Sequence, residues 1–329
     1  MANLYLTHKC NRGCPFCFAR KVLRESGGRV DELLTVDEVR RLLDRFQREL
    51  PAVGLLGGEP FLYPHLDELL ALLKERKVGA KIFTSATNPL PAVLERMTPE
   101  QAKADRINFV VNLGTRDTYT DEKFANLDRF FRRFAPVSCL SYTIFDLNAS
   151  ASHLFDLIDE YGLQRAIRTG IALPILHGGN SYIALDDYKR ASDYLVRVAS
   201  EAASRQIVMS MDCGFIACMF TDEQLGHLQR CGGELNFSCG AAVDIGPGLQ
   251  AWNCFPLFQV GRVDAMKASS LRELMDMLSA AVKAELGDAC GVKPECHTCD
   301  LMRRHLCEGG CASFKSCQEN ISYPSQINS

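Results

Sequence analysis

The stretch NLYLTHKCNRGCPFC, residues 3–17, decides how the rest of this sequence is interpreted. A short apolar run comes first, and Cys10, Cys14 and Cys17 follow it with the spacing C-x3-C-x2-C. The run predicts a buried strand, which places the three cysteines on a tight loop at its C-terminal end. Three thiolates on one loop can hold three irons of a cubane [4Fe–4S] cluster and leave the fourth iron open. A zinc site completed by His8 and a chance grouping of cysteines are the alternatives.

Short apolar runs of this kind recur up to about residue 205, alternating with amphipathic helical stretches. Each run fits a strand buried on both faces, and Thr35 with Glu38 forms a capping-box pattern before the first long helical stretch. Six such repeats predict an α/β fold in which a parallel sheet curves into a partial (β/α)6 TIM-like barrel. We assign residues 1–205 to this barrel and residues 206–329 to a small domain rich in cysteine, which holds eleven of the 15 cysteines.

Composition narrows the class of protein. A chain of 329 residues with 47% hydrophobic side chains and a net charge of −3 can bury a full-sized core. The sequence has no apolar stretch of membrane-spanning length and no signal-peptide pattern, so we expect a cytoplasmic protein with no membrane partner. In that reducing compartment, 15 cysteines indicate metal or cluster ligands, not disulfides. The lack of a basic tract with interleaved aromatic residues weighs against a nucleic-acid partner and an RNA-modifying activity.

A second motif, Gly57-Gly58-Glu59-Pro60, ends the second expected strand. It should therefore lie at the same end of the sheet as the cysteine loop. The two glycines would let the backbone of a ligand approach closely, and Glu59 could receive an ammonium group. Alone, the motif also suits an ordinary turn. Together with the cysteine loop it favours a cluster with one open iron.

These two motifs resemble those of the radical S-adenosylmethionine (SAM) superfamily, whose cysteine signature carries an aromatic residue before its last cysteine, here Phe16. The resemblance implies that SAM chelates the open iron and that residues 57–60 hold its amino group. One electron, from a donor such as flavodoxin or ferredoxin, would cleave SAM to a 5′-deoxyadenosyl radical that abstracts hydrogen from substrate. Further SAM contacts in such barrels come from later strand ends, where this sequence has Thr84, Ser85, Asn112, Ser141, Thr143 and Arg168. Each of these residues could equally cap a helix or face solvent.

The C-terminal region resembles a SPASM domain. Residues 296–311, CHTCDLMRRHLCEGGC, match the end of that domain, and residues 239–254 match its upstream segment. The resemblance implies one or two auxiliary [4Fe–4S] clusters. Mapped by order, the first would be held by Cys231, Cys239, Cys254 and Cys311, and the second by Cys296, Cys299, Cys307 and Cys317. A pair of zinc sites in a binding protein without redox chemistry is the alternative, since C-x2-C is common to zinc folds.

An extra pair of cysteines departs from the SPASM pattern. Cys213 and Cys218 could replace Cys231 as a ligand, or could close a site left open for substrate. Cys139 falls inside an expected strand and is expected to be a small buried hydrophobic residue. Cys290 has no motif partner and is expected to be structural. The ligands of the first auxiliary cluster are therefore the part of the site that the pattern leaves open.

Proteins with the architecture that this sequence resembles mostly modify ribosomally made peptides. The resemblance implies oxidation of a peptide to form a thioether or carbon–carbon crosslink, with the auxiliary clusters accepting the electron left on the substrate radical. Oxidation or epimerisation of a small molecule, such as a sugar, aminoglycoside or nucleoside, is the alternative. Sulfatase-type protein maturation is a further alternative, although Phe255 stands where that branch carries a carboxylate directly after a cysteine.

Binding of the peptide and acid–base chemistry are less defined by the sequence. The first expected strand begins at residue 3, so we expect a separate protein, or the surface of the barrel, to bind the leader of a peptide substrate. An exposed strand at the edge of the sheet could pair with an extended peptide. Asp212, His177 and Glu308 are candidates for an acid or base, but a lone carboxylate or histidine is more often structural, and the catalytic residues stay unassigned.

Overall fold

The computed structural model describes residues 2–19, 32–115, 118–175, 179–239, 242–287 and 291–318, with the backbone alone for residues 316–318. His177, Cys290 and the side chain of Cys317 lie outside the described residues. Within the described ranges, no helix is both long and apolar enough to cross a membrane.

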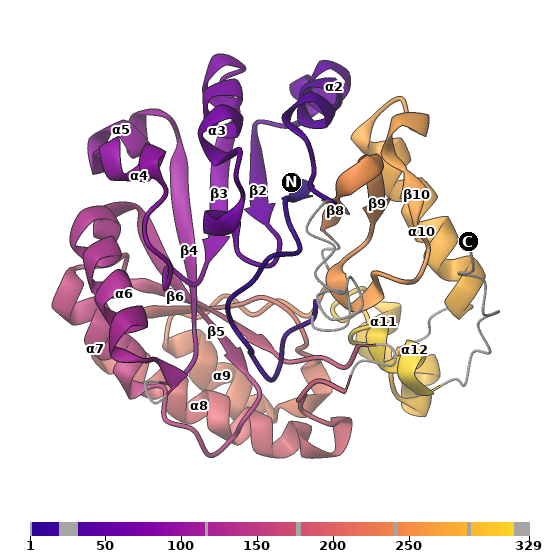
Figure 1. The fold of residues 1–329 in the computed structure, drawn as a ribbon. Helices are drawn as coiled ribbons and strands as arrows, with labels where there is room; N and C mark the ends of the chain where they lie inside the picture. Colours follow the sequence, from indigo (N-terminus) through magenta and orange to yellow (C-terminus); the bar gives the residue numbers. More distant parts are fainter. Residues whose placement is uncertain are drawn as a thin grey trace.

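The described strands form one ten-stranded sheet in the order β10-β9-β8-β1-β2-β3-β4-β5-β6-β7 (Figure 1). Strands β1 to β7 are parallel, and β8 adds a further parallel neighbour to β1. The strands are β1 (Ala2–Tyr5), β2 (Ala52–Leu56), β3 (Gly79–Thr84), β4 (Ile107–Leu113), β5 (Ser138–Ile144), β6 (Ala166–Ile171), β7 (Val208–Met211), β8 (Val243–Ile245), β9 (Gln250–Trp252) and β10 (Val263–Asp264). The large parallel sheet confirms the predicted α/β fold of partial-barrel type.

The sheet continues past the residue at which we divided the sequence. β7 begins at Val208, after the predicted barrel, and is a seventh parallel strand where six were expected. β8 to β10 extend the opposite edge of the same sheet, beyond β1. The division into residues 1–205 and 206–329 stays a prediction about the sequence, and the two parts share one sheet.

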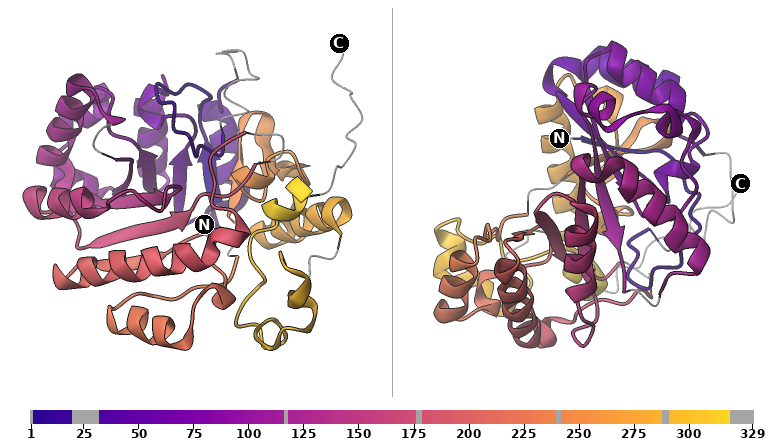
Figure 2. Two further views of the ribbon diagram at one scale, coloured as in Figure 1. Left: turned by 90° about the horizontal axis from the view of Figure 1, so that it is seen from below. Right: turned by 90° about the vertical axis from the view of Figure 1, so that its left-hand side faces the viewer.

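Helices cover the outer side of the curved sheet, and the last helices lie beyond its β8–β10 end (Figures 1 and 2). Thr35 caps the first long described helix through the expected box with Glu38. The described α-helices are α2 (Val36–Phe46), α3 (Leu66–Glu75), α4 (Ala92–Arg96), α5 (Pro99–Ala104), α6 (Asp121–Phe134), α7 (Ser152–Tyr161), α8 (Tyr188–Ser204), α9 (Asp222–Arg230), α10 (Leu271–Leu286), α11 (Asp300–Arg303) and α12 (Ser313–Gln318).

The two faces of the sheet differ in chemistry. On the outer face, Phe109 of β4 is fully buried and its ring packs against those of Phe130 and Phe134 of α6, with centroids 5.1 and 5.0 Å away. Side chains alternate along a strand, so Asn112 of β4 belongs to the other face. There it lies in register with Ser141 of β5, which is in turn in register with Arg168. The inner face therefore carries a polar row that crosses β4, β5 and β6.

Candidate cluster and cofactor site

The cysteine loop follows β1 directly, as expected. Its backbone turns so that Cys17 N donates to Cys14 O at 3.2 Å. Burial raises the pKa of the Cys10 thiol, and the negative charges of Glu59 and Cys14 raise it further. Burial likewise raises the pKa of Tyr5, with added repulsion from Cys17 and Cys10. The charges of the three thiols thus act on groups at the end of β1 and on one another.

Hydrogen bonds hold this loop over the ends of β3 and β4. Arg12 Nη1 donates to Asn112 O at 3.0 Å, and its guanidinium lies 5.2 Å from the centre of the Tyr119 ring. Asn11 and Asn88 exchange two amide hydrogen bonds, at 2.7 and 3.2 Å. These contacts were not expected from the sequence, in which the two polar residues between Cys10 and Cys14 are the one signal available.

The glycines of the second motif make room for the cysteine loop. A Cβ on Gly58 would lie 2.2 Å from Lys9 O and 2.9 Å from Cys10 Cβ, and one on Gly57 would lie 2.7 Å from Thr7 O. Gly58 N donates to Thr7 O at 2.7 Å, which joins the two segments. The glycines thus let the chain's own backbone approach closely, and their contact with a ligand stays a prediction.

Glu59 is 2% exposed, and both of its carboxylate oxygens accept hydrogen bonds. Thr84 Oγ1 and Phe61 N donate to Oε1 at 2.6 and 3.2 Å. Ser85 donates to Oε2 from its backbone N and its hydroxyl, at 2.9 and 2.7 Å. Because a carboxylate accepts about four hydrogen bonds, an ammonium group would have to share these oxygens. In the structure Glu59 fixes the end of β2 to the end of β3.

The structure brings three of the other predicted SAM contacts side by side. Asn112, Ser141 and Arg168 occupy matching positions on β4, β5 and β6. Arg168 Nη2 lies 2.7 Å from Asp212 Oδ1, and its guanidinium lies 5.3 Å from the centre of the Phe83 ring. Phe16, in the cysteine loop, packs on Phe145 with ring centroids 4.8 Å apart. Contact of these residues with SAM stays a prediction.

The donor set of the cysteine loop fits a thiolate-bound cluster. Three thiols lie on one loop that is tied to three strand ends, and burial, followed by repulsion from the charges of Glu59 and Cys14, raises the pKa of Cys10. A cationic iron core between them would relieve that repulsion. Among the described residues, no three or more His, Cys, Asp or Glu side chains are grouped as they would be around a single metal ion.

The predicted ligands of the C-terminal region separate into two neighbourhoods. The charges of Cys311 and Cys239 contribute to the raised pKa of Cys254, after its burial. Cys296 and Cys307 contribute in the same way to that of Cys218. Cys231 lies apart from both, beside α9, with its Sγ 3.5 Å from His227 Nε2. Glu308 accepts a hydrogen bond from Cys239 N at 2.6 Å, so this candidate acid or base supports a cysteine.

A comparison with protein families gives these features a name. The family model of the Radical SAM superfamily matches residues 4–133, which include the cysteine loop and residues 57–60. The chain carries a radical SAM domain. This domain runs from β1 to α6 and so contains the strand ends that hold the cysteine loop. The match and the overall fold indicate an enzyme.

Two curated relatives match parts of this chain. Over 78 residues it is 32% identical to the 7,8-dihydro-6-hydroxymethylpterin dimethyltransferase of Methanocaldococcus jannaschii, covering 23% of this chain and 15% of that protein. Over 92 residues it is 32% identical to the PqqA peptide cyclase of Granulibacter bethesdensis, covering 28% of this chain and 24% of that protein. The chain thus spans less than a third of the length of either relative.

A solved structure extends the likeness of fold to nearly the whole chain. SuiB of Streptococcus suis, bound to its precursor peptide SuiA, superimposes with a TM-score of 0.65 over 94% of this chain and 71% of SuiB. The structure of SuiB bound to S-adenosylmethionine gives a TM-score of 0.66. The sequences are 17% and 16% identical, so the likeness concerns the fold.

Proposed function

We propose that this chain is a radical SAM enzyme that makes a 5′-deoxyadenosyl radical and oxidatively modifies a ribosomally made peptide, through a thioether or carbon–carbon crosslink. The observation that carries the proposal is the SuiB-like fold over 94% of the chain, because that neighbour was solved with a precursor peptide. The partial identity with a peptide cyclase supports it. The partners that this function calls for are a precursor peptide and an electron donor such as flavodoxin or ferredoxin.

In this proposal each part of the site has its own task. Cys10, Cys14 and Cys17 hold the [4Fe–4S] cluster, and residues 57–60 position the cysteine loop and the amino group of SAM. When bound, cluster and SAM supply one electron and the radical that abstracts hydrogen. The polar row of Asn112, Ser141 and Arg168 orients SAM and substrate on the inner face of the sheet.

The experiment joins iron analysis to product analysis. The anaerobically reconstituted protein is chemically reduced in the presence of SAM. Irons per chain and 5′-deoxyadenosine are then measured for the wild type and for Cys14→Ala. We expect about twelve irons for three cubane clusters, and deoxyadenosine from the wild type alone. Peptides incubated with the enzyme should lose two hydrogen atoms by mass spectrometry. A wild type that binds zinc without iron and forms no deoxyadenosine would overturn the proposal.

Oxidation or other modification of a small molecule is the second candidate. It is favoured by the similarity to a pterin dimethyltransferase, whose name gives a small heterocyclic substrate. Deoxyadenosine formation that rises with added pterins, sugars or nucleosides and not with peptides would select this candidate. Sulfatase-type maturation calls for a peptide product without any crosslink, in which a serine side chain has lost two hydrogen atoms, or a cysteine side chain has lost two hydrogen atoms and exchanged its sulfur for oxygen by hydrolysis.

A further inference from the structure

The segment after β7 brings Cys213 to the inner end of the sheet. Cys213 O accepts a hydrogen bond from Ile171 N at 2.9 Å, and Gly214 O accepts one from the hydroxyl of Tyr188 at 2.9 Å. Gly214 has a φ of +94°, which allows the chain to turn sharply over the end of β6. These contacts fix the backbone of Cys213 next to Asp212, within the polar inner region.

The last cysteines reach the same place from the other edge of the sheet. Gly310 directly precedes Cys311. A Cβ on Gly310 would lie 2.9 Å from Ile216 Cγ2, so the segment that carries Cys311 touches the segment that follows β7. The neighbouring Glu308 donates from its backbone N to Phe237 O at 3.1 Å. Residues 307–312 thus bridge the segment after β7 and the segment that precedes Cys239.

Cys254 follows β9 and lies close to the segment that carries Cys311. Cys254 and Ala312 pack against one small apolar cluster made of Leu257, Val260 and Leu286. The short helix η8 (Phe255–Leu257), which follows Cys254, also contacts α12, which follows Cys311 closely. Four cysteine-bearing segments, around residues 213, 239, 254 and 311, therefore converge, although they come from both ends of the sheet.

Electrostatics agrees with this geometry. The Cys213 side chain is exposed to solvent, but protein atoms surround it, and this desolvation raises its pKa. The charges of Asp212, Cys311 and Cys239 raise it further. Desolvation and the charge of Cys311 raise the pKa of Cys239 to about 11.

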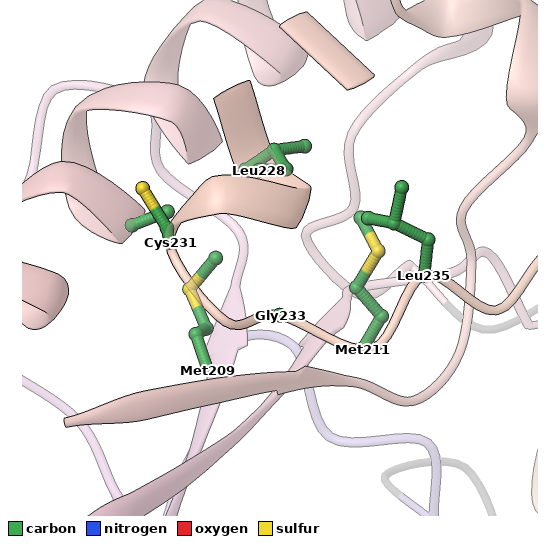
Figure 3. A pocket seen from close by; sticks show the side chains of 7 residues that line it. Met209, Met211, Leu228, Cys231, Gly233 and Leu235 are labelled. Carbon is green, nitrogen blue, oxygen red and sulfur yellow. The ribbon is translucent and has the colours of Figure 1, made fainter. Parts of the chain in front are cut away.

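Cys231 lies on the other face of β7. With Met209 and Met211 it lines a small apolar pocket between α8 and α9 (Figure 3). Met209 and Met211 alternate along the strand with Ser210, so the pocket lies opposite the face of the polar row. His227, the hydrogen-bond neighbour of Cys231, is itself 2.7 Å from Ser200 Oγ of α8. Cys231 would have to leave this packing to reach Cys311.

We propose that Cys213, and not Cys231, is the fourth ligand of the first auxiliary cluster, together with Cys239, Cys254 and Cys311. This inference rests on the proposed function, because it assumes that the region binds a cluster. It removes Cys231 from the ligand set that the order of cysteines implied. Cys218 stays outside this set, because it lies on the short helix η6 (Ala217–Met219), beyond the turn at Gly214.

The test counts iron in a full-length chain that lacks the SAM cluster. Cys10, Cys14 and Cys17 are changed to Ala, so that all remaining iron belongs to the auxiliary clusters. In this background, Cys213→Ala, Cys213→Ser and Cys231→Ala are reconstituted without oxygen, with Cys239→Ala as the positive control. Irons per chain and the electron paramagnetic resonance of the reduced clusters are measured, and circular dichroism checks that each variant is folded.

We expect both Cys213 variants to lose about four irons and one spectral component, as Cys239→Ala does, while Cys231→Ala keeps both. Loss of iron in Cys231→Ala with retention in the Cys213 variants would overturn the inference, as would equal behaviour of the two positions. If Cys213→Ala fails to fold, Cys213→Ser decides. A background chain that binds no iron would instead overturn the auxiliary clusters of the proposed function, which is a distinct result.

Discussion

Ser85 donates two hydrogen bonds to a single oxygen of Glu59, from its backbone N at 2.9 Å and from its hydroxyl at 2.7 Å. Glu59 is 2% exposed, and within the described residues its hydrogen-bond donors include no basic side chain. The Glu59 carboxylate therefore joins the ends of β2 and β3 through its hydrogen bonds with Thr84 and Ser85, close to the cysteine loop. We call this contact the Glu59 brace. Any bound ammonium group would be added to an acceptor that is already in use.

The first prediction concerns this brace. In Glu59→Gln an amide NH2 takes the place of one oxygen, so it opposes the donors of Ser85 or Thr84. We expect a loss of about 1–3 kcal/mol in the free energy of unfolding, because a buried donor is left without an acceptor. Denaturant unfolding under anaerobic conditions measures it. Glu68→Gln, at an exposed carboxylate of α3, is the matched control, and equal stability of the two variants would refute the brace.

The second prediction concerns the glycine that touches the cysteine loop. Gly58→Ala would place a methyl group 2.2 Å from Lys9 O, so the backbone of the loop must move. We expect a lower melting temperature and loss of about four irons per chain, with the auxiliary clusters retained. Gly13→Ala changes the same loop where nothing lies within 4 Å, and it should leave both quantities unchanged. Full iron content in Gly58→Ala would contradict the prediction.

The third prediction concerns Arg12, which ties the cysteine loop to β4. Arg12→Met removes the hydrogen bond to Asn112 O and the charge above the Tyr119 ring. A hydrogen bond from a charged group contributes about 1.5–3 kcal/mol, so we expect roughly tenfold or greater acceleration of local opening. Amide hydrogen exchange of residues 10–17 measures this directly. Arg40→Met, at an exposed position of α2, should show no acceleration, and unchanged exchange in Arg12→Met would count against the contact.

The fourth prediction concerns pH. Burial raises the pKa of Asp244 to about 7, and Asn3 Nδ2 donates to its Oδ1 at 2.8 Å. The unfolded carboxyl group has a pKa of about 3.9. Between these values the folded state holds the proton more tightly, so this contribution to stability is full below about pH 4 and is lost as pH rises toward 7. Above about pH 7 the carboxyl group is ionised in both the folded and the unfolded state, so the free-energy cost of burying its charge no longer changes with pH.

Asp244→Asn, which stays uncharged, isolates this effect. Relative to the variant, the wild type should lose up to about 1.4 kcal/mol of stability per pH unit across the window. Melting temperatures at pH 5 and pH 8 measure the difference. Asp276→Asn, at an exposed position in the middle of α10, should show no pH-dependent difference from wild type. A difference between wild type and Asp244→Asn that is constant with pH would show that Asp244 is ionised throughout.

Local features of this fold could be predicted from the sequence, because neighbouring residues determine them. Thr35 and Glu38 form the expected capping box, and Cys139 lies within β5. Contacts between distant segments could not be predicted in this way. The pairing of Glu59 with Ser85 depends on the register of β2 against β3, and no pattern near either residue encodes it.

The cysteine assignments show the same limit. Spacing identifies Cys10, Cys14 and Cys17 as one group, because they share a short loop. In the C-terminal region, ligand order along the chain does not report which face of a strand a side chain occupies. Cys231 lies in a pocket lined by residues of β7, α8 and α9, whereas Cys213 follows β7 at the end of β6, and this difference depends on how the segments pack.

The pairing of β1 with β8 has a consequence for synthesis on the ribosome. Asn3 is in register with Gly54 on one side and with Asp244 on the other. Because chains emerge at about 5–20 residues per second, β1 has an open edge for roughly ten seconds or longer after β2 has been made. During that interval the cysteine loop, at the end of β1, is reachable from the side that β8 later closes. Delivery of iron and sulfide to this loop is therefore least hindered before the last quarter of the chain has been translated.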